Sequence, residues 1–238
     1  FEGLADSMLN HDPLFSRLSE EGFRVVAFDY MGHGGSEGSM NRTRIRAIPK
    51  IGDQVWKRFA RDLDRHPTKT LIGWSTGGLA AYVAATEGDA DRVVLIAPGL
   101  APNVIVGEGT RSWPPDRITL STLTSAYPYS SGESNPHRDP IRPDTPAKVV
   151  SFATDLIATS LVFRHVRAPE SVRGLVLLSG ENDTYVDSKQ VRTILSRIAP
   201  RFEIVPPYSG ALHEIDNERD EIRKSAVGEI VRFLISTP

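Results

Sequence analysis

The stretch Thr70-Leu71-Ile72-Gly73-Trp74-Ser75-Thr76-Gly77-Gly78-Leu79 decides which fold this chain can adopt. A short apolar run leads into Gly-x-Ser-x-Gly, and the small residues that follow, up to Ala85, suit a helix. Strand, serine turn and helix in this order are the context that gives the motif a chemical meaning. In such a turn the serine lies on a strained backbone with its hydroxyl clear of the sheet, and glycines on either side avoid a collision. By itself the motif is short enough to describe an ordinary turn.

The bulk composition fits a globular domain with a sizeable core. Of the 238 residues, 39% are hydrophobic and 24% are charged. The net charge of −2, from 28 basic and 30 acidic residues, argues against a nucleic-acid partner and against a polybasic membrane surface. No apolar run of the sequence approaches the ~20 residues of a transmembrane helix. Because the chain has no cysteine, disulfides, thiol catalysis and cysteine-based zinc sites are excluded.

Apolar runs alternate with helical patterns along the chain, which predicts an α/β fold with a mostly parallel central sheet flanked by helices. Buried strands are expected at 23–28, 70–72, 92–97, 174–179 and 202–205. Helices are expected from Asp12 to Gly22, over 51–63, after the serine turn, over 148–163, from Asp187 to Pro200 and over 222–234.

Between residues 100 and 168 this alternation stops, and the chain becomes rich in Pro, Ser, Thr and aromatic residues. So long a stretch within a compact domain is expected to be functional or a subdomain of its own. We therefore expect a core made of 1–99 and 169–238, with a cap inserted at 100–168. Trp113 and Tyr127 of the cap, with Trp74 beside the serine, are candidates for binding an apolar substrate, although aromatic residues also simply pack.

The chemistry of Ser75 depends on partners, because a serine hydroxyl is a poor nucleophile without a base and a carboxylate that orients the base. For this type of turn the expected order along the chain is serine, acid, histidine. Asp183 and His213 each follow an expected strand, so the three side chains can meet at one sheet edge. The competing carboxylates are Asp187, which resembles a helix cap, and Glu181 and Glu214, which stay open. The N–H of Thr76, at a helix N-terminus, can face a developing oxyanion.

A glycine-dense loop, Asp29-Tyr30-Met31-Gly32-His33-Gly34-Gly35-Ser36-Glu37-Gly38, follows the first expected strand. Its glycines do not match a dinucleotide-binding fingerprint, because the G-x-G-x-x-G spacing fails and no helix opens there. We expect Asp29 to hold this loop by hydrogen bonds and His33 to be structural. The other histidines are expected on the surface or in the cap: His11, His66, His137 and His165.

Together these segments resemble the α/β-hydrolase superfamily, and most closely its branch similar to monoacylglycerol lipase, lysophospholipase and serine aminopeptidase. Four stretches carry the resemblance: Gly3-Leu4-Ala5-Asp6, the glycine-dense loop, the serine turn, and 180–183 with 213–218. The resemblance implies a Ser75-Asp183-His213 triad, a second oxyanion N–H at Leu4, a lipid-like ester substrate, and neither a metal nor an organic cofactor. Glu2 stands where that family has histidine, and Met31 where it commonly has arginine. The family also has strands before Gly3, so further N-terminal residues are expected.

Other functions stay open at this stage. The same fold also suits a peptidase, a thioesterase or an acyltransferase, and a hydrolase fold can serve as a non-catalytic binding module. The acidic residues of the cap are scattered among arginines, which gives little support to recognition of a substrate amine. A cytoplasmic location is only the default expectation, and the sequence does not indicate an oligomeric state.

Overall fold

The computed structural model describes residues 1–236 apart from 5, 62–66, 104–122 and 127–145. In this part of the chain, one parallel sheet is formed in the order β1-β2-β3-β4. Its strands are β1 (Thr70–Trp74), β2 (Arg92–Ile96), β3 (Arg173–Leu177) and β4 (Glu203–Ile204). The expected α/β architecture is therefore confirmed, and these strands lie where the sequence predicted them, with β4 shorter than expected.

The register of the sheet brings the ends of its strands to one edge. Trp74 pairs with Ile96, which in turn pairs with Leu177, so β1, β2 and β3 end side by side. Both faces of β2 are covered, since consecutive residues from Val93 to Ile96 are at most 1% exposed. Such a fully buried strand explains why the sequence reads as a continuous apolar run rather than an alternating one.

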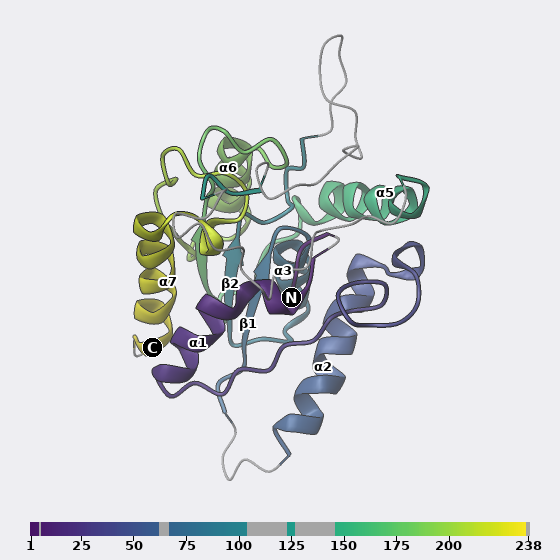
Figure 1. The fold of residues 1–238 in the computed structure, drawn as a ribbon, viewed down its shortest axis with the longest axis horizontal. Coiled ribbons are helices and arrows are strands. Elements are labelled where there is room, and N and C mark those ends of the chain that lie inside the picture. The colour runs from purple at the N-terminus through teal and green to yellow at the C-terminus, as the bar shows by residue number, and fades with distance from the viewer. Residues whose placement is uncertain (5, 62–66, 104–122, 127–145, 237–238) are drawn as a thin grey trace.

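Helices lie around this sheet (Figure 1). They are α1 (Asp12–Glu20), α2 (Ile48–Phe59), α3 (Thr76–Glu87), α5 (Pro146–Phe163), α6 (Ser188–Ile198) and α7 (Asp220–Ile235), with 3-10 turns η1 (Met8–His11), η2 (Met40–Arg42), η3 (Ile45–Ala47) and η4 (Ile215–Asn217). Helix α5 stands beyond the strands, against α3 and the turns η2 and η3. Helix α3 packs on β1 and β2, whereas α7 packs on β3 and on α1. Buried small residues from Leu79 to Ala85 let α3 lie directly on the sheet.

The helix ends follow the local signals in the sequence. Pro13 stands in the first turn of α1, and Gly22, which adopts a φ of 84°, lies just after its end. The Asp187 carboxylate accepts the backbone N–H of Lys189 and Gln190, so the predicted cap of α6 is confirmed.

The strand expected at 23–28 is wrong. Within the described residues this segment forms no ladder with a neighbouring strand. A cavity of about 450 Å³, lined by both segments, lies between residues 23–28 and β1. An apolar run favours a buried strand but cannot supply the neighbouring strand that its backbone needs. Next to this cavity, the Phe1 nitrogen donates to the Ile72 carbonyl over 2.6 Å, and the Trp74 N–H donates to the Phe1 carbonyl over 3.1 Å.

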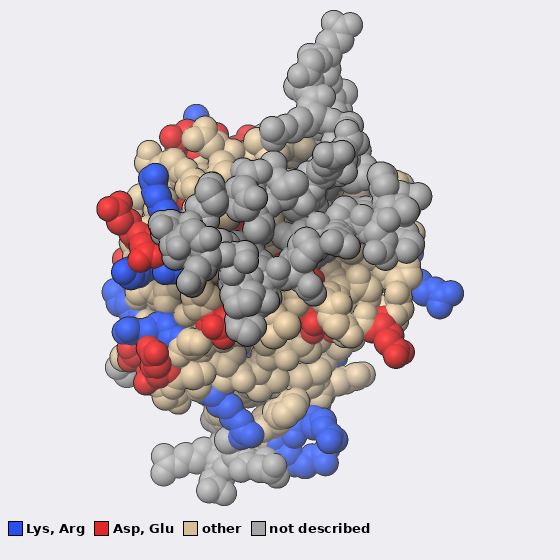
Figure 2. Space-filling view, viewed as in Figure 1, with Lys and Arg blue, Asp and Glu red and all other residues tan. Residues whose placement is uncertain are grey.

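Charged side chains on the α7 side of the molecule are mixed in sign, with Lys and Arg beside Asp and Glu (Figure 2). Within α7, Asp220 pairs with both Arg223 and Lys224. This mixed surface agrees with the near-neutral net charge of the sequence. In the described ranges, no helix combines the length and the hydropathy that crossing a membrane requires.

Candidate active site

Ser75 occupies the strained turn between β1 and α3. Its φ of 55° and ψ of −114° are a conformation that residues other than glycine rarely adopt. Neighbouring backbone groups hold it there: the Ser75 N–H donates to the Ile96 carbonyl, and the Ser75 carbonyl accepts the N–H of Gly99 and of Leu79. The turn is thereby fixed to β2 and to the loop that follows it, which is how the sheet can impose a strained serine.

The predicted need for glycine on both sides of the serine is confirmed. A Cβ atom built on Gly73 would lie 2.2 Å from the Gly77 carbonyl oxygen, and one built on Gly77 would lie 2.2 Å from the Phe1 carbonyl oxygen. Both contacts are with backbone atoms, which cannot rotate away as the end of a long side chain can. The close approach of these backbones is therefore available only to glycine.

Gly73→Ala is expected to lower the free energy of unfolding by about 1–3 kcal/mol, because the new methyl group would push against the first turn of α3. Gly228→Ala is the matched control: it lies inside α7, and nothing would lie within 4 Å of its added Cβ. That variant is expected to gain about 0.5–1 kcal/mol from helix propensity. Urea denaturation of both variants measures the difference, and equal stabilities would contradict the account of the turn.

His213 links Ser75 to Asp183 in one hydrogen-bonded row. The Nε2 atom of His213 lies 2.7 Å from the Ser75 hydroxyl oxygen, and its Nδ1 atom lies 2.7 Å from Oδ2 of Asp183. His213 and Asp183 are buried, at 2% and 8% exposed. The three residues follow β1, β3 and β4, so the common edge of the parallel sheet brings them together.

Hydrogen-bond donors surround the Asp183 carboxylate. Its Oδ2 also accepts the Ser179 hydroxyl at 2.5 Å, and its Oδ1 accepts the N–H groups of Tyr185 and Val186. Burial by itself would raise the pKa of Asp183, but His213 and these donors hold that pKa below its usual value. An ionised Asp183 fixes the proton of His213 on Nδ1 and leaves Nε2 free to accept the Ser75 proton.

A small cavity of about 30 Å³ opens at the Ser75 hydroxyl. Leu4 and Thr76, the two residues expected to supply oxyanion N–H groups, both border it, together with Ser75 and His213. The remaining described residues that line it are largely apolar: Trp74, Gly99, Pro102, Leu156, Tyr185 and Val186. Thr76 is the first residue of α3, so its N–H has the position from which a helix N-terminus stabilises negative charge.

Trp74, predicted to bind substrate, borders the cavity at Ser75 but is almost wholly buried. The residue is 3% exposed, and its indole packs against His213 with ring centroids 5.2 Å apart. Its Nε1–H donates to the His213 carbonyl over 3.0 Å. Trp113 and Tyr127, the other two predicted substrate contacts, and most of the expected cap at 100–168 lie outside the described residues. The substrate contacts and the cap boundaries therefore stay predictions.

The hydrogen bonds expected of Asp29 are confirmed, whereas a structural role for His33 stays a prediction. The Asp29 carboxylate accepts the N–H of Met8 and of Gly35, each over 2.8 Å, so it ties the glycine-dense loop to the N-terminal segment. His33 Nδ1 lies 3.3 Å from the Met31 carbonyl, within the loop.

Glu2, which stands in the position of the family's histidine, accepts the N–H of Tyr30. Burial and nearby Asp29 raise the pKa of Glu2 to about 10, so it is protonated at neutral pH.

His11 contradicts its predicted place on the surface. It is 4% exposed and lies between the carboxylates of Asp6 and Asp216. The sequence carried no signal of this pairing, since His11 and Asp216 are 205 positions apart.

Two of the acids that competed with Asp183 lie elsewhere. Glu181 is exposed, and the Glu214 carboxylate accepts a hydrogen bond from the side-chain amide of Asn217.

A parallel sheet with a serine turn after one strand and a histidine loop after another is the architecture of the α/β-hydrolases. The family model described as "Serine aminopeptidase, S33" matches residues 1–220. The chain belongs to this family, as the resemblance stated from its sequence indicated.

Individual relatives agree with this assignment. Monoglyceride lipase of Rattus norvegicus is 25% identical over an alignment 250 residues long that covers 96% of this chain and 78% of that protein. Two solved structures are similar in fold. The monoacylglycerol lipase of Paleococcus ferrophilus has a TM-score of 0.73 and 22% identity, covering 98% of this chain and 91% of its own. A soluble variant of monoglyceride lipase from Saccharomyces cerevisiae has a TM-score of 0.72 and 16% identity, and the match covers 100% of this chain and 86% of that one.

Proposed function

We propose that the protein hydrolyses carboxylic esters of lipid-like alcohols, of the monoacylglycerol or lysophospholipid type, through an acyl-enzyme on Ser75. The observation that carries the proposal is the row in which His213 lies 2.7 Å from both the Ser75 hydroxyl and the Asp183 carboxylate. This is the arrangement that turns a serine into a nucleophile at neutral pH. The lipase names of the relatives support the substrate class.

The reaction follows from the geometry in two steps. His213 Nε2 takes the Ser75 proton while Oγ attacks the ester carbonyl carbon, and the Thr76 and Leu4 N–H groups stabilise the oxyanion. The C–O bond to the alcohol then breaks, and His213 returns its proton to the departing alkoxide. A water molecule then attacks the acyl-serine carbonyl carbon while His213 takes one of its protons. The bond between that carbon and Oγ breaks, His213 returns the proton to Ser75, and the carboxylic acid leaves. Asp183 remains ionised throughout and stabilises the imidazolium that forms in each step.

The family description favours a second candidate, an aminopeptidase that would cleave an N-terminal amide on the same serine. Such an enzyme needs a carboxylate close to the site to bind the substrate ammonium. None of the described residues that line the cavity at Ser75 is acidic. Apolar residues such as Leu4, Leu156 and Val186 suit an acyl chain better than a charged amine.

A panel of substrates separates the two candidates. We expect kcat/KM for monoacylglycerols with short to long acyl chains, followed by release of fatty acid, to exceed kcat/KM for aminoacyl p-nitroanilides by at least about a hundredfold. That margin is the size of discrimination expected when a buried apolar site must accept a charged group without a partner. Preference for the anilides would favour the aminopeptidase, and inactivity on the whole panel would contradict the proposed hydrolase.

A further inference from the structure

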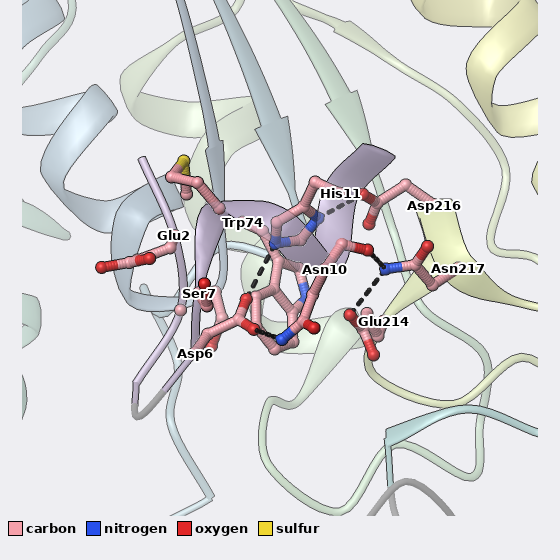
Figure 3. A network of polar contacts seen from close by, with 12 residues as sticks. Glu2, Asp6, Ser7, Asn10, His11, Trp74, Glu214, Asp216 and Asn217 are labelled. Atoms are coloured by element: carbon pink, nitrogen blue, oxygen red, sulfur yellow. Dashed lines mark hydrogen bonds and ion pairs between the residues drawn. The ribbon is translucent and has the colours of Figure 1, made fainter. Parts of the chain in front are cut away.

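A second polar network, separate from the row at Ser75, lies beside the Trp74 indole. In Figure 3 the His11 ring stands between two carboxylates: its Nε2 is 2.8 Å from Oδ2 of Asp6, and its Nδ1 is 2.6 Å from Oδ2 of Asp216. The side-chain amide of Asn10 donates to the other oxygen of Asp6 over 2.5 Å. Asp6, Asn10 and Asp216 are each at most 2% exposed, so the whole network is buried.

The network joins the two loops on which the proposed reaction depends. Asp6 lies two residues after Leu4, whose N–H is the proposed second oxyanion donor, and Asp216 lies three residues after His213. A parallel connection runs from the Asn217 side-chain amide to the Asn10 carbonyl over 2.7 Å. The His11 ring thus bridges the oxyanion loop and the histidine loop, and the Asn217 amide makes a second connection beside it.

The Trp74 indole contacts both this ring and the catalytic histidine loop. The centroid of His11 lies 5.6 Å from that of Trp74, whose other contacts include the His213 ring and carbonyl. A Cβ built on Gly3 would lie 2.2 Å from the same indole, so the oxyanion loop also rests on it. A shift of His11 therefore displaces either loop relative to the strained serine turn.

A ring with a proton on each nitrogen satisfies both short contacts at once, because an ionised carboxylate only accepts hydrogen bonds. Burial opposes a charge on the ring, but Asp216 and Asp6 outweigh it and raise the pKa of His11 well above its usual value. Other ionisable groups near the network are Glu214 on the histidine loop, Glu2 and the Phe1 amino group on the N-terminal segment, and Tyr30 and His33 on the glycine-dense loop.

The spacing of this cluster also resembles that of a cation site, since atoms of Asp6, His11 and Glu214 lie within 4.8 Å of one another. However, both nitrogens of His11 are already in hydrogen-bond contact with carboxylate oxygens. A metal ion would have to replace one of those contacts, whereas a proton on each nitrogen satisfies both. The donor set therefore fits a buried imidazolium better than a metal ion.

We propose that His11, as an imidazolium held between Asp6 and Asp216, is a positioning residue that sets the oxyanion loop and the His213 loop at their working separation. This inference rests on the proposed ester hydrolysis. The ring touches neither Ser75 nor the cavity beside it, so it acts on the transition state through the two loops and not on substrate binding. Loss of the bridge should therefore lower kcat and leave KM nearly unchanged.

His11→Gln is expected to reduce kcat on a monoacylglycerol by about 10- to 100-fold, the cost of a small misplacement of catalytic groups, with KM changed less than about twofold. His165→Gln, at an exposed position after α5, is the matched control and should keep the wild-type constants. Adding Asp216→Asn to His11→Gln should cost little more, because the bridge in which Asp216 takes part is already lost in His11→Gln. An unchanged kcat in His11→Gln, or a loss confined to KM, would overturn the inference.

Asp216→Asn alone provides a readout that a merely structural contact would not move. Removing one carboxylate lowers the pKa of His11, so kcat of this variant should fall toward high pH at a value where the wild type is still flat. A basic limb identical to that of the wild type would count against the proposal.

Nuclear magnetic resonance of the ¹⁵N-labelled wild-type protein tests the charge without any activity. We expect both His11 ring nitrogens, assigned by their loss in His11→Gln or perturbation in Asp216→Asn, to stay protonated at pH 8. A neutral ring there overturns the inference whether or not the protein is an esterase. A wild-type protein inactive on every ester would instead defeat the proposed function.

Discussion

Ser75→Ala is expected to lower kcat for ester hydrolysis by roughly five to six orders of magnitude, because the acyl-enzyme cannot form without its hydroxyl. KM should change little, since the hydroxyl contributes to reaction more than to binding. The fold should persist: the Ser75 backbone, not its side chain, makes the bonds to Ile96 and Gly99 that hold the turn.

Steady-state assays of purified Ser75→Ala, with circular dichroism to verify folding, measure this effect. Ser16→Ala is the matched control, because Ser16 is exposed on α1 and its removal should leave kcat unchanged. A residual rate is assigned to the variant only where it exceeds the rate of a mock purification from cells without the protein. Activity in folded Ser75→Ala above about a hundredth of the wild-type value would exclude Ser75 as the nucleophile.

Asp183→Asn carries the second largest expected effect, a loss of about 10⁴-fold in kcat. The amide keeps the size of the carboxylate but cannot accept the Nδ1 proton with a full charge, and it can donate to Nδ1 instead. His213 would then hold its proton on Nε2, where it no longer accepts the proton of Ser75. The buried donors Ser179 and Tyr185, which bond the carboxylate in the wild type, would also lose a charged acceptor.

Asp187→Asn is the matched control, because it makes the same change from carboxylate to amide four residues further along the chain. Asp187 caps α6, and asparagine is a comparably good cap, so both stability and kcat should stay close to the wild type. Rate measurements across the pH range of both variants distinguish the roles of the two carboxylates. If Asp183→Asn kept more than about a tenth of wild-type kcat, another acid would have to orient His213.

The sequence predicted the sheet and the meeting of Ser75, Asp183 and His213 because these features depend on local order along the chain. An apolar run followed by a turn places each residue just after a strand, and parallel strands place their ends at one edge. The spacing of small residues after Ser75 likewise predicted α3, which lies buried on the sheet.

Two features escaped the sequence because they depend on partners far away. The apolar pattern of 23–28 describes a strand, but a strand forms only beside another, and in the described residues a cavity lies between that segment and β1. His11 was expected on the surface or in the cap, because nothing near it in the sequence indicated a buried partner. Its burial is explained only by Asp216, which the fold brings to it from the far end of the chain. A single sequence gives no periodicity that would reveal such a pair.

The most direct test of the account is the site of covalent modification by an alkyl p-nitrophenyl phosphonate, which imitates a lipid ester and traps a serine nucleophile. Intact-protein mass spectrometry should show one phosphonyl group per chain, and peptide mapping should place it on Ser75. The reaction should be absent in Ser75→Ala and slowed in Asp183→Asn. Modification at another residue, or none on folded wild-type protein, would contradict the assignment of this serine turn as a catalytic site.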